Sequence, residues 1–223
     1  MTISSDFLTT NLSAFAVDLQ KQAFGETAAP LKEPVTLAKV KTFARISTAS
    51  EDSLISGLIT AARIEAEKWC NRIFIERAFQ LFIDRPPMSV VLEFPVSPIS
   101  AVSQVSSFSE DDTETVFDAD NFRVDTLSVP PRLILKNGKV WPSVVRNSSS
   151  FKVSFTAGYG LDEDDVPAPI KEAIKVIVTH IWELRGQIEE KGDAGTTGTG
   201  PLVGRFPQDA ILLLSPFRVI YLG

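Results

Sequence analysis

The hydrophobic residues of this chain change their spacing twice. Over residues 54–70 they recur every three or four positions, as on one face of an amphipathic helix. Within residues 79–83 and 151–155 they alternate instead, which is typical of a strand with one buried face. Helical spacing returns over residues 170–184. The order predicts an α+β fold, in which a helical bundle is interrupted by an inserted antiparallel β-domain.

Capping residues indicate where the first two helices begin. Thr36 precedes apolar residues at helical intervals, so it can cap a short first helix. Thr48 and Glu51 have the spacing of a capping box, in which each side chain bonds the other residue's backbone. We therefore expect a long helix over residues 50–71.

Proline and glycine mark the later boundaries. A third helix is predicted over residues 169–185, with Gly186 as its stop. Residues 191–204 are rich in glycine and are expected to form a mobile loop. Pro207 can then open a short helix through Leu214, before an extended end.

These boundaries suggest three parts. Residues 34–75 and 165–223 form the helical domain, and residues 76–160 form the inserted β-domain, as a small sandwich or barrel. The acidic stretches SEDDTET and LDEDD are interpreted as loops. Residues 1–33 are expected to be an N-terminal arm with a short helix around residues 12–24, or else a first helix packed on the body.

Charge and cysteine content exclude several classes of protein. The chain has 223 residues and a net charge of -6, which argues against tight binding to nucleic acid but is compatible with the wall of a DNA channel. Cys70 is the single cysteine, so an intrachain disulfide and a thiolate zinc site are both excluded, and a reducing cytoplasm fits. Neither a signal peptide nor a bilayer-spanning run is found, so we expect a soluble protein.

No residue set has the pattern of a catalytic, metal or cofactor site. The only histidine, His180, lies within a helical apolar pattern, and Cys70 at a helix end is best explained by packing. The LDEDD stretch lacks the oxygen spacing of an EF-hand. Trp141 and Tyr159 leave open a carbohydrate- or nucleic-acid-binding module that would use the β-domain as a stacking platform.

Several strings, taken in order, resemble the head-to-tail connector (adaptor) proteins of tailed bacteriophages. The similarity covers about residues 34–219, and none of its strings is an enzymatic signature. It rests on PVTLAKVKTFARI, EDSLISGLITAARIEAEKWCNR, FPVSPISAVSQV, PPRLILKNGKVWP, VSFTAGYG, VPAPIKEAIKVIVTHIWELR and LLLSPFRV.

The resemblance implies a structural, non-enzymatic virion assembly protein. Its members form a ring, expected to be a dodecamer, in the neck between capsid and tail. Such a ring binds the portal protein and a stopper or tail protein, and the genomic DNA passes through its channel without specific binding. Assembly would take place in the cytoplasm of a bacterial host, with no membrane and no cofactor involved. A tail-terminator or tail-tube component is the alternative.

The carboxyl end has more apolar residues than a free terminus would ordinarily carry. We expect it to bind the portal or a neighbouring subunit, so that deletion of residues 207–223 would leave a folded chain that no longer binds the portal. The alternative is that this tail folds back on its own helices. The residues assigned to the interface are Leu212, Leu213, Leu214, Pro216, Phe217, Arg218, Val219, Ile220 and Tyr221.

Overall fold

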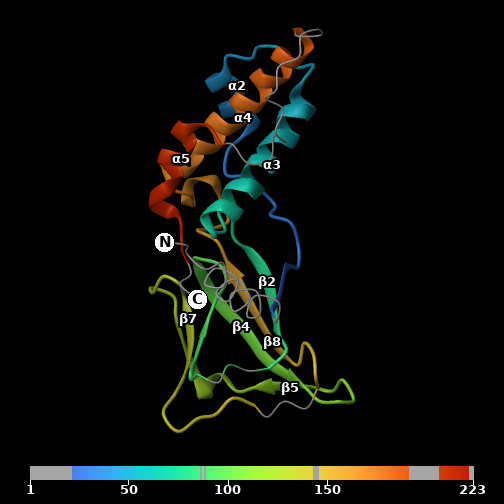
Figure 1. Ribbon diagram of the computed structural model, residues 1–223, viewed down its shortest axis with the longest axis vertical. Helices are drawn as coiled ribbons and strands as arrows, with labels where there is room; N and C mark the ends of the chain where they lie inside the picture. Colours follow the sequence, from blue (N-terminus) through green and yellow to red (C-terminus); the bar gives the residue numbers. More distant parts are fainter. Residues whose placement is uncertain (1–21, 86, 88, 143–145, 191–205, 221–223) are drawn as a thin grey trace, which may run out of the picture. The chain divides into compact units, whose positions relative to one another are not determined.

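The computed structural model describes residues 22–85, 87, 89–142, 146–190 and 206–220 (Figure 1). The chain divides into two compact units. The helical unit comprises Pro30–Glu76 and Gly158–Val219, and the β unit comprises Arg77–Ala157 with Met1–Ala29 and Ile220–Gly223. Helices and antiparallel sheets confirm the predicted α+β class. The glycine-rich stretch 191–204 lies outside the described residues.

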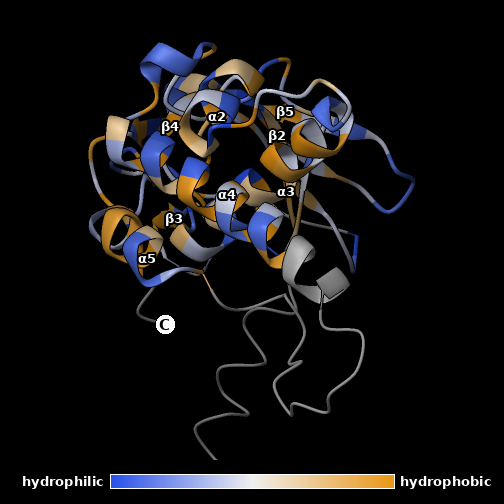
Figure 2. Ribbon diagram, turned by 90° about the horizontal axis from the view of Figure 1, so that it is seen from above, coloured by the Kyte–Doolittle hydropathy of each residue, from blue (hydrophilic) through white to orange (hydrophobic). Residues whose placement is uncertain are grey.

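Four α-helices make up the described part of the helical unit, and two short 3₁₀ turns accompany them. In Figure 2 the same helices show both hydrophobic and hydrophilic stretches, as amphipathic helices should. The helices are α2 (Leu37–Ala44), α3 (Asp52–Cys70), α4 (Ala168–Glu190) and α5 (Gln208–Leu214), and the turns are η2 (Glu163–Asp165) and η3 (Ser215–Phe217).

The helix ends confirm one predicted cap and correct two others. Thr36 caps α2 by accepting from the Lys39 amide. The capping box is wrong, because α3 begins at Asp52 and Glu51 makes no side-chain cap. Gly186 does not end α4, which continues to Glu190. One glycine in a helix interior costs only about 1 kcal/mol relative to alanine, and the good helix formers that follow it compensate.

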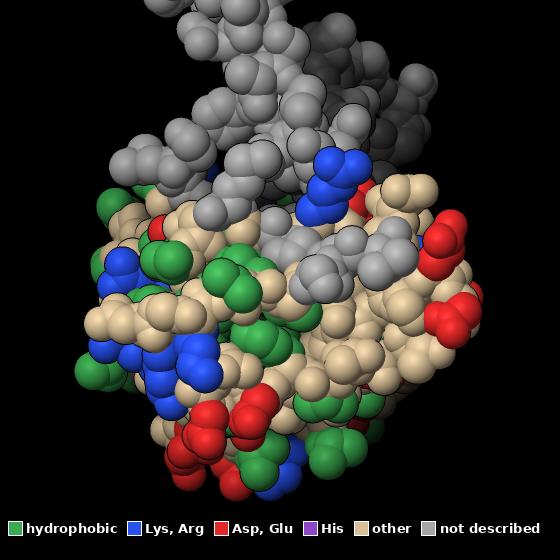
Figure 3. Space-filling view, turned by 90° about the horizontal axis from the view of Figure 1, so that it is seen from below, with side chains coloured by type: hydrophobic (Ala, Val, Ile, Leu, Met, Phe, Trp, Pro, Cys, Tyr) green, Lys and Arg blue, Asp and Glu red, His purple; other side chains and the backbone are tan. Residues whose placement is uncertain are grey.

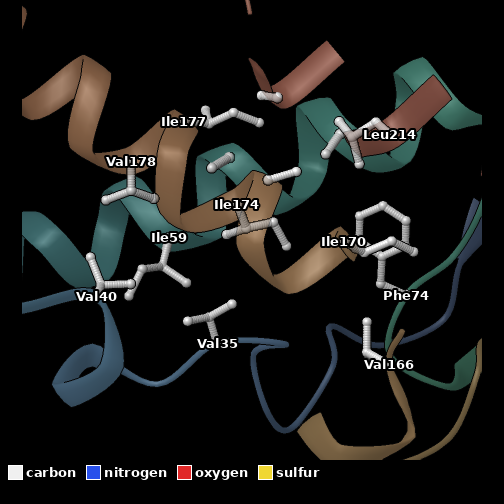
Figure 4. Close-up of a cluster of buried hydrophobic side chains, with 14 of the residues drawn as sticks. Val35, Val40, Ile59, Phe74, Val166, Ile170, Ile174, Ile177, Val178 and Leu214 are labelled. Atoms are coloured by element: carbon white, nitrogen blue, oxygen red, sulfur yellow. The ribbon is translucent and has the colours of Figure 1, made fainter. Parts of the chain in front are cut away.

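The core of the helical unit lies between α3 and α4, and Figure 4 shows its side chains pointing toward one another. The predicted stripe on α3 is confirmed at the five positions that are almost completely buried, whereas Leu58 and Trp69 are partly buried and Leu54 is 37% exposed. The buried residues are Ile55, Ile59, Ala62, Ala66 and Cys70 on α3, Ile170, Ala173, Ile174, Ile177 and Val178 on α4, and Val35, Val40, Phe74, Ile75, Val166, Ala210 and Leu214 around them.

The β unit contains two antiparallel sheets. The five-stranded sheet has the order β1-β2-β8-β4-β5 and the three-stranded sheet the order β3-β7-β6, and neither closes into a barrel within the described residues. The strands are β1 (Gln22–Glu26), β2 (Arg77–Ile83), β3 (Val91–Glu93), β4 (Ile99–Phe108), β5 (Glu114–Phe117), β6 (Phe122–Asp125), β7 (Arg132–Leu135) and β8 (Phe151–Ala157).

Alternating side chains bury one face of the large sheet against the small one. In β8, every second residue from Phe151 to Ala157 is buried, as the alternation predicted. The sheets meet through aromatic rings: Phe94, just after β3, lies 5.0 Å from Phe155, and Phe117 on β5 lies 6.1 Å from Phe122 on β6. This two-sheet arrangement corresponds to the sandwich alternative.

Three segments differ from the sequence-based expectation. Residues 22–26, assigned to a helix or arm, form β1, because Phe24 stacks on Phe79 at 5.0 Å and the backbone pairs with β2. The SEDDTET stretch is not all loop, since Glu114 begins β5. The longest strand, β4, was not predicted, because its serines, alanine and glutamine mask the alternation and its pairing with β8 is irregular.

Candidate interaction surface of the carboxyl-terminal segment

The segment from Phe206 to Val219 packs along its own helical unit. Pro207 precedes α5, as predicted, and α5 lies against α4. Ala210 and Leu214 are fully buried in the shared core, with Leu213 partly buried beside them. Much of the apolar surface of this segment is therefore covered within the unit itself.

A polar clamp at the end of α3 holds the last turn of the segment. Asn71 takes the left-handed conformation that ends the helix, with φ of 53°, and its Nδ2 donates to the Val219 carbonyl at 2.9 Å. The Val219 amide donates to the Cys70 carbonyl at 2.9 Å, and Arg72 Nε donates to the Phe217 carbonyl at 2.5 Å. This clamp was not predicted, although an asparagine directly after a helical pattern signals a left-handed cap.

Aromatic and sulfur contacts complete the docking. The Arg218 guanidinium lies 4.9 Å from the centre of the Trp69 ring, and the Trp69 and Phe206 rings are nearly perpendicular with their centres 6.3 Å apart. Cys70 is fully buried beneath Leu214, and burial raises the pKa of its thiol to about 12. A thiol that stays protonated at neutral pH is a packing group, as expected.

The predicted interface residues therefore divide into two groups. Leu214 and Val219 are buried, and Phe217 packs against the core, so the segment folds back on its own helices at these positions. Leu212 and Ile220 remain 62% and 68% exposed. Leu213 is partly buried, Pro216 and Arg218 are exposed, and Tyr221 lies outside the described residues. Deletion of residues 207–223 would remove Ala210 and Leu214 from the core, and the folding of the truncated chain stays a prediction.

A buried charge network holds the segment before α2 against α3. Arg63 on α3 is 4% exposed, and its Nε donates to Glu33 at 2.8 Å and its Nη1 to Glu67 at 3.0 Å. Glu67 in turn accepts from the Phe74 amide at 2.8 Å, and Thr60 donates to Glu33 at 2.9 Å. The network links the segment before α2, two successive turns of α3 and the chain that leaves α3.

The acidic LDEDD stretch forms ion pairs within the helical unit. Lys32 pairs with Asp162, and Lys39 pairs with Glu163 at 2.6 Å. The stretch lines one wall of a cavity of about 760 Å³ together with residues before α2 and on α3. Among the described residues, no group of three or more His, Cys, Asp and Glu side chains is arranged to hold a metal ion. Nor does any described helix have the length and apolarity needed to cross a bilayer.

The aromatic platform proposed for ligand stacking is used in packing. Trp141 lies edge-on to Phe151 at 5.5 Å and donates to the Ser89 carbonyl at 2.7 Å within the β unit. Tyr159 packs against the core of the helical unit. Figure 3 shows acidic, basic and hydrophobic side chains interspersed on one face, without a basic groove there. These observations do not support a nucleic-acid-binding module.

Comparison with known proteins identifies the family. The family model described as head completion protein matches residues 33–219. The chain belongs to the head completion protein family. The predicted resemblance to phage head-to-tail connectors is confirmed, and family membership points to a structural role in the virion. The match begins at Glu33, in the charge network, and ends at Val219, in the clamp.

Solved structures similar to this head completion protein come from gene transfer agent (GTA) particles. The neck of an empty GTA particle with C6 symmetry matches with a TM-score of 0.72 and 20% identity, over 90% of this chain and 97% of that chain. The virion of a native GTA particle gives 0.70 and 19%, over 89% and 96%. The neck of a native particle with C12 symmetry gives 0.67 and 18%, over 90% and 97%. No curated protein matches the chain.

Proposed function

We propose that this head completion protein is a structural, non-enzymatic subunit of the virion neck, where a ring of copies joins the portal to a stopper or tail protein. The observation that carries the proposal is the family match over residues 33–219. The likeness of the whole fold to chains from GTA necks supports the position in the neck. Its mechanism is mechanical, because buried interfaces hold the head and the tail together.

The ring is proposed to be a dodecamer. The C12 symmetry of one similar neck supports this number, and C6 symmetry, reported for the other, is contained within it. Cyclic assembly requires two different, complementary surfaces on each copy. With a net charge of -6, the ring repels DNA phosphates, so the genome passes through the channel without specific binding.

The portal or a neighbouring subunit is proposed to bind the exposed part of the carboxyl-terminal segment. Leu212 presents 62% of its surface to solvent from a helix that Leu214 anchors in the core. Ile220, at 68%, follows directly after the clamped Val219. A rigidly held apolar group binds at a lower entropic cost than one on a free terminus. The other exposed positions assigned to this surface are Pro216 and Arg218, and Tyr221, also assigned to it, lies outside the described residues.

The position in the particle is tested by removing the chain. Particles produced without it should have DNA-filled heads that lack tails, as seen by negative-stain electron microscopy. Supplying the full-length chain in trans should restore tails. Tailed, infectious or gene-transferring particles made without the chain would refute the proposed function.

The portal-binding surface is tested with one pair of variants. Leu212→Ser removes an exposed leucine from α5, and Leu161→Ser removes a leucine of the same 62% exposure from elsewhere in the helical unit. We expect at least a tenfold loss of portal pull-down for Leu212→Ser and wild-type recovery for Leu161→Ser. If Leu212→Ser binds the portal like the wild type, Leu212 is not part of the interface. The proposed position of the protein in the neck is not affected by that result.

A further inference from the structure

The two edges of the five-stranded sheet are open within the described residues. β1 and β5 stand at opposite ends of the order β1-β2-β8-β4-β5. Open edges expose unpaired amides and carbonyls, and proteins usually protect them with lysine, proline or a bulge. Neither β1, with the sequence QAFGE, nor β5, with ETVF, has lysine or proline, and the pairings of both are regular.

The two edges have the same strand direction. All four neighbouring pairs in this sheet are antiparallel, so the direction alternates and the first and fifth strands run the same way. One step of rotation in a twelve-fold ring turns a strand by at most about 30°, so it cannot reverse the direction of the strand. If β5 of one copy meets β1 of the next, the two strands must therefore pair in parallel.

Backbone bonds identify the groups that face outward. The Thr27 amide donates to the Ala78 carbonyl at 3.0 Å, so the alternation of an antiparallel pair turns the amides of residues 22, 24 and 26 away from β2. At the other edge, the Ser109 amide donates to the Thr113 carbonyl at 3.1 Å, which turns the amides of Glu114 and Val116 away from β4. Each edge thus presents a short ladder of donors and acceptors that no other described residue pairs.

Side-chain charge does not oppose the contact. The acidic residue of β1, Glu26, is paired with Arg77 at 2.7 Å, and that of β5, Glu114, is paired with Lys152 at 2.6 Å. The apolar side chains at the edges remain partly uncovered, with Phe24 39% and Val116 62% exposed. Both edges are therefore close to neutral and retain apolar surface that a neighbouring strand would cover.

We propose that β5 of one copy pairs in parallel with β1 of the next copy, so that the five-stranded sheets continue from subunit to subunit around the ring. The proposal rests on the ring assembly given under the proposed function, and it names the surfaces that close the ring. β1 and β5 are two different, complementary surfaces on one chain, as head-to-tail cyclic assembly requires.

Engineered cysteines test the pairing directly. Ala23, Gly25 and Val116 share the sheet face opposite to Phe24 and Phe117, so residue 116 should lie beside residue 23 or 25 of the next copy. Within one chain the two edges are four strand spacings, about 19 Å, apart, which is too far for a disulfide. A new Cβ at Gly25 meets nothing within 4 Å, and the native Cys70 is buried.

The experiment uses full-length double variants in particles isolated from producing cells. On mild oxidation, Gly25→Cys/Val116→Cys or Ala23→Cys/Val116→Cys should give a ladder from dimer up to the full ring on a non-reducing gel. Each single variant should stay monomeric. The matched control Gly25→Cys/Thr115→Cys should also stay monomeric, because Thr115 points to the other face.

The outcomes separate this inference from the proposed function. Tailed particles that contain the double-variant chain but give no ladder in either register, or that cross-link it to a different protein, overturn the edge pairing while the neck role stands. Absence of the chain from particles would overturn both.

Proline gives a second measurement. Val116→Pro removes an outward amide, and Val116→Ala is its matched control. We expect at least tenfold fewer tailed particles for proline and wild-type numbers for alanine. Glu26→Pro against Glu26→Ala repeats the comparison at β1, since both variants lose the ion pair with Arg77. Wild-type numbers for both folded proline variants would contradict the pairing.

Discussion

Leu212 and Leu214 are the same residue type on the same helix, but the structure gives them opposite roles. Leu214 is completely buried in the helical core, whereas Leu212 is 62% exposed. Truncating a fully buried leucine to alanine removes apolar contacts and leaves a cavity. We expect Leu214→Ala to lower the free energy of unfolding by about 3 kcal/mol. Leu212→Ala should change it by less than about 0.5 kcal/mol.

The difference is large enough to measure by urea unfolding. With a denaturant slope of about 2 kcal/mol per molar urea, Leu214→Ala should lower the midpoint by about 1.5 M. Tryptophan fluorescence reports on the helical unit, which contains Trp69 and Trp182, if Trp141 of the β unit is first replaced by phenylalanine. Both leucine variants are compared in this background.

The variant with the lower stability should be the one that binds the portal better. Leu214→Ala should bind the portal normally in the absence of urea as long as it remains folded, whereas Leu212→Ala should bind less well at wild-type stability. Equal midpoints for the two variants would show that α5 does not contribute to the core. That result would refute the division of the segment into an anchor and an exposed surface.

Three further predictions concern the helical unit and the β unit. Arg63→Met should lower the free energy of unfolding by about 3–5 kcal/mol, because the buried Glu67 carboxylate loses its ion pair with Arg63, and the double variant with Glu67→Gln should recover part of the loss in urea titrations. Cys70 should resist iodoacetamide at pH 8 until the chain unfolds. The pKa of its thiol is near 9 in the unfolded chain and about 12 in the folded one, so the free energy of unfolding should fall as the pH rises from 9 to 12. Gly158→Ala should lower the melting temperature far more than Gly138→Ala. Both glycines have positive φ, but a Cβ at Gly158 would lie 2.3 Å from the Glu76 Cα, whereas a Cβ at Gly138 meets nothing within 4 Å.

Periodicity predicted the elements that bury one face. The helical stripe on α3 and the alternation in β2 and β8 are visible in the sequence because each periodic position contributes an apolar side chain to a core. β4 is also a strand, but two of its serines, Ser106 and Ser107, are buried, its burial does not alternate, and its register with β8 shifts. β4 forms because β5 and β8 pair with it, and the local sequence does not show which strands will lie beside it.

The interaction surface shows the same limit. Nine residues of the carboxyl end were predicted to form one interface because they are mostly apolar. Their sequence does not separate Leu212 from Leu214, since the direction of a side chain on a seven-residue helix is set by the helix on which it docks. The clamp by Asn71 and Arg72 joins residues more than 140 positions apart, which is outside the range of any local pattern.

The sequence by itself determined the α+β class, the order of the elements, the absence of an intrachain disulfide and the resemblance to connector proteins. All four depend on residue type, count and spacing along the chain. Only the tertiary structure decided which apolar residues of the carboxyl end are buried, which acidic residues are paired and which strands stand at the edges of the sheet. These properties arise from contacts between distant segments, and the free energy of such contacts depends on where the rest of the chain lies.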